Sequence, residues 1–294
     1  MWWLLIPGAG IVFLLVILIR SSRERKMLEN TCYEVPVRDL PEELSDTELL
    51  FLTDLHDEEF GEDNLKLLKA LQEYPADAVL IGGDMLTVKE NHSGDMRALR
   101  AVLEAFSGKL PVYYGLGNHE TRMRENPEDY PGWYERFLAL IREYNVILLD
   151  DSSAYLTKNG RSIRISGFTL DRKYYRKGHT EKLDVSAVTS ALGPSRDMPE
   201  IVLLHSPMYG ETLSAWGADL VLSGHFHGGT VRLPLLGGVM TPQLQFFSPL
   251  AKGRKEYGDT TEIVSGGLGT HSIRIRFMNK PDIVRVRLVR KEDK

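Results

Sequence analysis

Short runs of consecutive apolar residues recur along the chain, and several of them stop at a polar or glycine-rich cluster. Such runs are typical of strands in a sheet that is buried on both faces. Five of them precede a histidine or an aspartate: residues 49–52 before TDLH, 78–81 before GGDM, 112–116 before GNHE, 201–204 before HS, and 220–222 before SGHFHGG. Open α/β sheets bind ligands beyond the carboxyl ends of their strands, so these five clusters are expected to meet at one edge.

The segments between these runs predict helices and one tight hairpin. Helical spacing occurs in residues 64–73, with Leu65, Leu68 and Leu71 on one face, and again in residues 96–106 and 134–144. Residues 154–157 and 163–168 are expected to form a hairpin around Asn159–Gly160, a favoured tight-turn pair. Further short strands are predicted at residues 34–38, 261–264 and 283–289. The alternation of strands and helices indicates an α/β fold.

The first residues differ from the rest of the chain, because no charged side chain occurs from Trp2 to Ile19. Eighteen residues form about 27 Å of helix, close to the thickness of a bilayer core. No basic region precedes the run and no small-residue cleavage site follows it, which favours an uncleaved anchor over a signal peptide. We therefore expect a transmembrane anchor over residues 1–20.

The basic sequence RSSRERK follows at residues 20–26. Basic residues next to a membrane span prefer the cytoplasmic side, so a single-pass protein with a cytoplasmic domain is expected. We predict a basic linker over residues 21–32 and one catalytic domain over residues 33–294.

Composition narrows the class of protein further. Apolar residues make up 43% of the chain and charged residues 26%, which is ordinary for a folded domain. The net charge of −5 gives no basic excess, so no nucleic-acid partner is expected. The single cysteine, Cys32, excludes an intramolecular disulfide. Neither feature determines the oligomeric state.

The five polar clusters together contain the donor atoms of a metal site. Asp54 and His56 are two residues apart, so in an extended chain both point to the same side, and His225 and His227 repeat that spacing. The other candidate ligands in these clusters are Asp84, Asn118 and His205, with His119 as a further histidine. This set suits two divalent cations that share a carboxylate. Mixed nitrogen and oxygen ligation favours Mn, Fe, Zn or Ni over Ca or Mg.

The order D-x-H, GD, GNHE, strand-end histidine and GHxH resembles the calcineurin-like metallophosphoesterases, over about residues 45–290. The resemblance implies a four-layer α/β/β/α sandwich, here preceded by one N-terminal transmembrane helix. It implies that one metal is held by Asp54, His56, Asp84 and His227. It assigns the second metal to Asp84, Asn118, His205 and His225, with Asp84 bridging the two ions.

The resemblance also implies hydrolysis of a phosphate ester by metal-activated hydroxide, with His119 as the catalytic proton donor. Family members often have GDxxD as the second motif, and its last aspartate supports the histidine of GNHE. This chain has Thr87 at that position, so the group that orients His119 is left open.

One bacterial phosphodiesterase branch matches more closely, through GHFHGGTVRLP and the tail SGGLGTHSIRIRFMNKPDI. Its members often carry an N-terminal membrane or export segment, and some are UDP-2,3-diacylglucosamine hydrolases. By this resemblance, Arg276 is a candidate phosphate-binding residue, and a phosphodiester or pyrophosphate is the expected substrate. The anchor makes a lipid-linked substrate attractive, although anchors also serve enzymes with soluble substrates.

Two alternatives remain open at this stage. The same fold also supports phosphomonoesterases and protein phosphatases, but the arginine that commonly follows GDxxD in protein phosphatases is replaced here by Val88. The chain could instead be a membrane-anchored metal-binding module without catalysis. The basic, aromatic segment at residues 171–179 is interpreted as a solvated loop rather than as a substrate rim.

Overall fold

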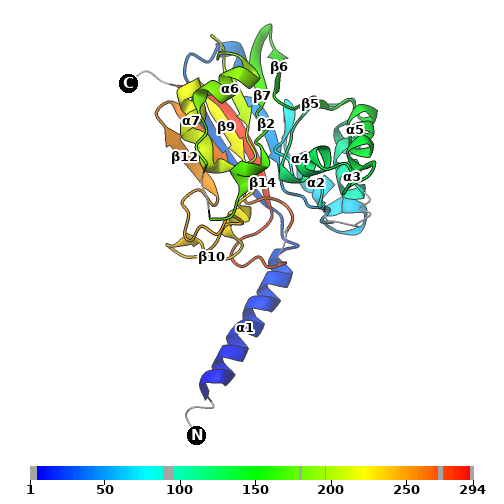
Figure 1. Cartoon of the computed structure of the whole chain (residues 1–294), viewed down its shortest axis with the longest axis vertical. Helices are drawn as coiled ribbons and strands as arrows, with labels where there is room; N and C mark the ends of the chain where they lie inside the picture. The colour runs from blue at the N-terminus through cyan, green and yellow to red at the C-terminus, as the bar shows by residue number, and fades with distance from the viewer. Residues whose placement is uncertain (1–4, 89–95, 179–180, 196, 271–273, 292–294) are drawn as a thin grey trace.

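The computed structural model describes the chain except residues 1–4, 89–95, 179–180, 196, 271–273 and 292–294, and it describes side chains from residue 15 onward. Two six-stranded sheets lie face to face in the main domain (Figure 1). The first sheet has the order β1-β14-β2-β3-β4-β5. Its strands are β1 (Glu29–Val37), β14 (Asp282–Arg290), β2 (Thr47–Leu52), β3 (Ala78–Ile81), β4 (Val112–Gly115) and β5 (Ile147–Leu149).

The second sheet has the order β12-β13-β9-β8-β7-β6, and a two-stranded ribbon lies outside both sheets. Its strands are β12 (Gly253–Tyr257), β13 (Thr260–Val264), β9 (Leu220–Ser223), β8 (Glu200–Leu203), β7 (Arg161–Gly167) and β6 (Ser152–Lys158). The ribbon consists of β10 (Arg232–Leu233) and β11 (Gly237–Gly238). In both sheets the central strands pair in parallel, so their carboxyl ends point to the same edge.

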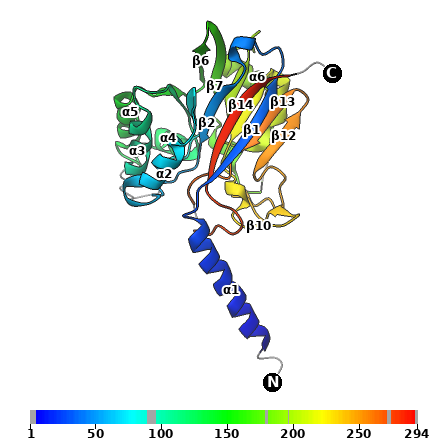
Figure 2. The ribbon, with the colours of Figure 1, turned by 180° about the vertical axis from the view of Figure 1, so that it is seen from behind.

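Helices cover the outer faces of both sheets, as the two opposite views show (Figures 1 and 2). The first sheet is covered by α2 (Leu65–Gln72), α3 (Arg97–Phe106) and α5 (Trp133–Glu143), and the second by α6 (Val185–Leu192) and α7 (Gly210–Trp216). Side chains along β2 point alternately to the two faces of the first sheet, which shows how the layers pack. Leu50 and Leu52 pack against the helices, whereas Leu49 and Phe51 pack against the second sheet. The four-layer arrangement predicted from the sequence is therefore observed.

The hairpin predicted around Asn159–Gly160 is confirmed, because β6 pairs antiparallel with β7 and both turn residues have positive φ. The predicted face of α2 was right at Leu71 but wrong at Leu65. Leu67 and Leu71 are buried, whereas Leu65 is 64% exposed. Leu65 is the first residue of the helix, and the buried stripe follows the four-residue spacing between Leu67 and Leu71.

The N-terminal helix α1 (Leu5–Glu24) projects from one end of the domain (Figure 1). Within the part of the chain that the structure describes, no helix meets the length and apolarity needed to cross a membrane. Most of the predicted anchor, residues 1–20, has its side chains outside that part. The residues predicted as a linker, 21–32, instead include the last turn of α1 and the beginning of β1, so only residues 25–28 separate helix from strand.

Candidate metal centre

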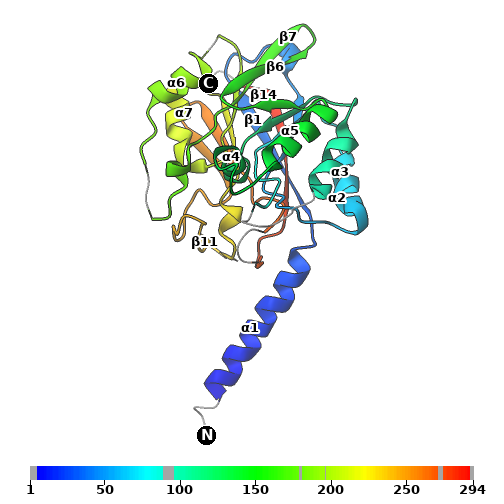
Figure 3. The same ribbon diagram turned by 45° about the vertical axis from the view of Figure 1, so that its right-hand side comes forward.

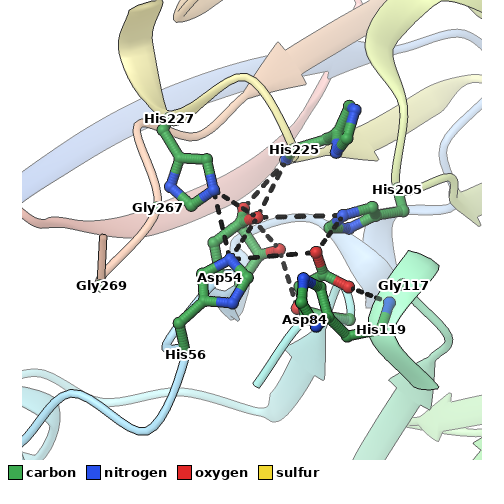
Figure 4. Close-up of polar contacts among 12 residues, drawn as sticks. Asp54, His56, Asp84, Gly117, His119, His205, His225, His227, Gly267 and Gly269 are labelled. Atoms are coloured by element: carbon green, nitrogen blue, oxygen red, sulfur yellow. Dashed lines mark hydrogen bonds and ion pairs between the residues drawn. The ribbon is translucent and has the colours of Figure 1, made fainter. Parts of the chain in front are cut away.

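The seven predicted metal ligands all lie in loops or at a helix start that directly follow strands of the two sheets. Asp54 and His56 follow β2, and Asp84 follows β3. Asn118 and His119 are the first residues of α4 (Asn118–Glu125), which begins after β4. The second sheet contributes His205 after β8, and His225 and His227 after β9. The carboxyl ends of both sheets therefore converge, as expected, on one buried site (Figure 4).

Three groups of side chains in this site are arranged so that each could hold a cation. In each group, the potential ligand atoms lie within 4.8 Å of one another. The groups are Asp54, His56 and His227; His56, Asp84 and His119; and Asp84, His205 and His225. His56 and Asp84 are each shared by two groups, so the donors form a continuous cluster rather than separate sites. Nitrogen and carboxylate donors in this mixture are typical of transition-metal sites.

The distances within the cluster place imidazole nitrogens around the two carboxylates. Nε2 of His227 lies 3.5 Å from Oδ1 of Asp54, and Nε2 of His205 lies 3.2 Å from Oδ2 of Asp84. Nε2 of His56 is 3.7 Å from Oδ1 of Asp54 and 3.8 Å from Oδ2 of Asp84. These side chains are turned toward a common centre (Figure 4).

The electrostatics of the site indicate that positive charge belongs there. Burial raises the pKa of a carboxyl group, yet the neighbouring histidines hold the pKa of Asp54 and Asp84 below the ordinary value. Burial lowers the pKa of a histidine, yet Asp84 raises the pKa of His205 to about 10. For His227 burial dominates and lowers the pKa to about 3. The two buried carboxylates therefore stay ionised and stabilise positive charge beside them, which divalent cations can supply in place of a protonated ring.

Further features of the buried atoms and the backbone fit a metal. Oδ1 of Asn118 is buried and has no hydrogen-bond partner among the described residues, and an amide oxygen in that state is a suitable ligand. Five predicted ligands have left-handed backbone conformations: Asp54, His56, Asp84, His225 and His227, with φ between 47° and 64°. Each costs about 1 kcal/mol or more, and strain of this kind collects at functional sites.

Two glycines of GHFHGG are required by their neighbours. A Cβ on Gly224 would lie 2.3 Å from Oδ2 of Asp54, so the close approach of the loop after β9 to the carboxylate needs glycine. A Cβ on Gly228 would lie 2.3 Å from Oδ1 of Asn279. Nδ2 of Asn279 in turn donates to the carbonyl of His227 over 2.7 Å. Gly224 therefore makes room for the carboxylate of Asp54. Gly228 makes room for Asn279, which holds the backbone of His227 in place.

Glu120, the last residue of GNHE, has a positioning role that the sequence analysis missed. Its carboxylate is fully buried and accepts hydrogen bonds from the backbone N–H groups of Asp84 (2.8 Å), Met85 (3.1 Å) and Gly117 (3.0 Å), and from the hydroxyl of Tyr114 (2.9 Å). It therefore joins the loop that carries Asp84 to the start of α4. Its place in the GNHE motif was the available signal.

The backbone next to Thr87 answers the question of what orients His119. The N–H of Val88 donates to Nδ1 of His119 over 2.8 Å. An acceptor role for Nδ1 assigns the ring proton of a neutral imidazole to Nε2. The family resemblance led us to expect an aspartate here, and this chain instead supports the ring through a peptide N–H.

Arg276, predicted to bind phosphate, is 1% exposed and lines the cavity that reaches His227. Its guanidinium donates to the carbonyls of Gly267 (2.8 Å) and Gly269 (2.5 Å). Gly267 packs against Asp54, because a Cβ on it would lie 2.8 Å from that of the aspartate. These contacts hold the loop behind Asp54, and phosphate binding by Arg276 stays a prediction.

The pocket in front of the ligands is lined partly by the segment interpreted from sequence as a solvated loop. Tyr175 places its ring 5.0 Å from that of His225, and Arg172 and Lys177 line the same pocket. Arg122 joins them from α4, one turn after His119. The described part of this segment, from Arg172 to Lys177, therefore borders the site. Its mixture of basic and aromatic residues was a signal for this position.

Comparisons with known proteins agree with the geometry. The family model described as calcineurin-like phosphoesterase matches residues 47–229. The chain is 24% identical over 286 residues to an uncharacterised metallophosphoesterase, YkoQ of Bacillus subtilis, covering 96% of this chain and 98% of that protein. It is 22% identical over 244 residues to the phosphodiesterase YaeI of Escherichia coli, covering 82% of each.

A similar vertebrate protein is a transmembrane protein with a metallophosphoesterase domain from Danio rerio. It is 27% identical over 279 residues, which cover 92% of this chain and 58% of that protein. The family match spans more than half of the chain and includes all seven predicted ligands. The chain therefore belongs to the calcineurin-like phosphoesterases and is a metal-dependent phosphoesterase.

Proposed function

We propose that this phosphoesterase hydrolyses a phosphodiester or a pyrophosphate and that it uses two divalent cations. Two of the three donor groups support the proposal of two ions, because Asp54, His56 and His227 form one group and Asp84, His205 and His225 form the other. One ion would be held by Asp54, His56, Asp84 and His227, and the other by Asp84, Asn118, His205 and His225. When bound, such ions lower the pKa of a water and withdraw charge from phosphate oxygens.

The shape of the site favours a substrate with groups on both sides of the phosphorus. The ligand pocket shares Arg122, Arg172 and Tyr175 with one neighbouring cavity. It shares Lys177, His227 and Pro242 with another cavity of about 280 Å³. A diester or pyrophosphate has two substituents to place, whereas a monoester has one. The name of the related phosphodiesterase YaeI supports the same choice.

A phosphomonoesterase or protein phosphatase is the second candidate, because Arg122 and Arg172 line the pocket. A dianionic monoester gains more from two guanidinium groups than a monoanionic diester does. A pyrophosphate, with its second anionic group, would gain from them as well. The third candidate, a non-catalytic metal-binding module, predicts bound metal without turnover.

The substrate assay separates these candidates. Full-length protein in detergent is stripped with chelator, and Mn, Fe, Zn or Ni is added back singly. Turnover is compared for bis(p-nitrophenyl) phosphate, p-nitrophenyl phosphate and a pyrophosphate diester. Metal-restored cleavage of the first or third substrate over the second supports the proposal. Preference for the monoester supports the second candidate, and bound metal without cleavage of any substrate supports the third.

For His119 we propose hydrogen-bond donation from Nε2 to the leaving-group oxygen or to a phosphate oxygen. Nδ1 is engaged with the N–H of Val88, so the ring acts as a neutral donor. Replacing His119 by Ala should lower kcat by about 10²–10⁴-fold with the metal content unchanged. His119→Gln, which keeps an N–H donor, should retain more activity. Full activity of His119→Ala would show the role to be wrong, and loss of metal would make His119 a ligand.

We also propose that residues 1–20 anchor the protein in a membrane, with the catalytic domain on the cytoplasmic side. The uncharged run from Trp2 to Ile19 and the basic residues after it support this proposal. Extraction of membranes at alkaline pH tests the anchor, because a spanning segment stays in the pellet. Protease protection of the domain in sealed vesicles tests the side.

A further inference from the structure

The end of the domain from which α1 leaves exposes large apolar side chains on loops. Leu235 is fully exposed, Phe246 is 65% exposed and Leu236 is 58% exposed. Folded domains seldom present several such side chains in one region unless that region contacts something apolar. We call this surface the apolar end and define it by Leu235, Leu236, Leu244, Phe246, Phe247 and Met278.

Backbone hydrogen bonds hold these loops together as one surface. Leu235 and Leu236 connect β10 to β11, and after β11 the N–H of Phe247 donates to the carbonyl of Val239 over 3.1 Å. The N–H of Arg232 in β10 donates to the carbonyl of Phe277, next to Met278, over 2.9 Å. The apolar side chains are therefore displayed by a connected framework.

The last turn of α1 is fixed to the same framework by buried polar contacts. Oγ of Ser21 accepts from the N–H of Arg276 over 3.0 Å, and Oε2 of Glu24 accepts from the N–H of Asn279 over 3.2 Å. The guanidinium of Arg20 lies 5.0 Å from the ring centroid of Phe277. Ser21 and Glu24 are nearly completely buried. The direction of α1 relative to the apolar end is therefore set by specific contacts, and three views place them at the same end (Figures 1, 2 and 3).

The chemistry of this end matches a lipid bilayer. The described part of α1 exposes Leu15, Val16, Leu18 and Ile19, each between 45% and 56%. Two exposed basic residues follow: Arg23 in the last turn of α1 and Lys26 just after the helix ends. Apolar side chains bordered by cations suit the boundary between acyl chains and anionic head groups.

We propose that the apolar end dips into the bilayer leaflet next to α1, as a second membrane contact that holds the domain against the lipid surface. This inference rests on the proposed anchoring of α1. It has a consequence for the site, because Leu244 and Met240 line the cavity that reaches His227. One entrance to the metal centre then opens at the lipid interface, where an amphiphilic phosphate ester can enter without leaving the membrane.

Fluorescent probes on single cysteines test the contact in the full-length chain. In a Cys32→Ser background, Leu235→Cys and Phe246→Cys are labelled with an environment-sensitive dye and placed in nanodiscs of zwitterionic and anionic lipid. Tyr155→Cys is the matched control, since Tyr155 is 43% exposed and lies on β6, at the end of the domain opposite to α1 (Figure 1). We expect a blue shift and quenching by doxyl-labelled lipid at positions 235 and 246, and neither at position 155.

The outcomes separate the inference from the anchor on which it rests. If the chain enters nanodiscs but the probes at 235 and 246 are as exposed to water as the probe at 155, the apolar end does not contact lipid. A partner protein would then be its occupant, and the inference is overturned. Failure of the chain to enter nanodiscs removes the proposed anchor and the inference with it. As a folding control, Leu235→Ser should keep the wild-type Tm and turnover of a soluble diester.

Discussion

The space between the two sheets and the carboxyl edge of those sheets differ in the side chains they bury and in their backbone conformation. Between the sheets, residues such as Ile165, Leu203 and Leu222 are almost completely buried in an apolar cluster with ordinary strand conformations. At the edge, five buried residues that carry carboxylates or imidazoles have left-handed backbone conformations: Asp54, His56, Asp84, His225 and His227. The first region stabilises the fold. The second is held in a costly arrangement by the first, which is the expected relation between a core and a functional site.

The largest predicted effect is a loss of turnover caused by a substitution at the carboxyl edge. Asp84→Asn removes the carboxylate shared by two donor groups, while Oδ1 can still accept from the N–H of His119. Turnover should fall by about 10²–10³-fold or more. Turnover assays and metal analysis check this, and wild-type turnover of Asp84→Asn with added metal would contradict the comparison.

The reverse pattern is predicted for the core. Ile165→Ala should lower the free energy of unfolding by about 2–5 kcal/mol, through lost burial and a cavity. Turnover per folded molecule should stay near wild type, since Ile165 lies on β7 away from the ligands. Denaturant unfolding and active-site titration measure the two quantities. Ile165→Val is the matched control and should cost about 1 kcal/mol.

Glu262 sharpens the comparison, because it is a buried acid without the histidine neighbours of Asp54. Burial raises its pKa to about 8, although Ser223 and Tyr257 donate to it. A raised pKa means that its stability contribution is complete below the unfolded pKa and is lost as pH rises through about 8. We expect roughly 5 kcal/mol of stability to be lost between pH 4.5 and about 8. Glu262→Gln should flatten this slope in pH-dependent unfolding, and an unchanged slope would contradict the assignment.

The smallest effect is expected at the β6–β7 turn, which belongs to neither region. Gly160 has φ of 78°, and a Cβ added to it would meet nothing within 4 Å, so Gly160→Ala encounters backbone strain alone. It should cost about 1 kcal/mol without changing turnover. Comparing its Tm with that of the wild type checks this, and a loss of activity would mean that the turn affects the site.

Metal bound at the carboxyl edge should also raise the free energy of unfolding of the whole domain. Addition of the activating cation at about 100 times its Kd should raise the free energy of unfolding by about 2.7 kcal/mol per site. The same addition should leave Asp84→Asn nearly unchanged. Calorimetry with and without chelator measures the difference, and equal stabilisation of both proteins would place the metal elsewhere.

The sequence by itself determined most strands of the two sheets, the order of the motifs and a set of candidate metal ligands that the fold brings together. Continuous apolar runs allow few alternatives to buried strands, and parallel strands bring their carboxyl-end residues to one edge. That is why Asp54, Asp84 and His225, far apart in the chain, were expected together. The Asn159–Gly160 turn was equally local, because its positive φ values are a property of those residues.

Only the tertiary structure decided what supports the ligands. Three contacts join segments that are distant in sequence: the N–H of Val88 on His119, the N–H groups of Asp84 and Met85 on Glu120, and Asn279 on the carbonyl of His227. Neither the buried role of Arg276 nor the position of Tyr175 beside His225 follows from spacing. Motifs record which groups meet a metal, because that chemistry restricts the residue type. Supporting contacts use peptide groups that every residue carries, so they become visible only when the chain is folded.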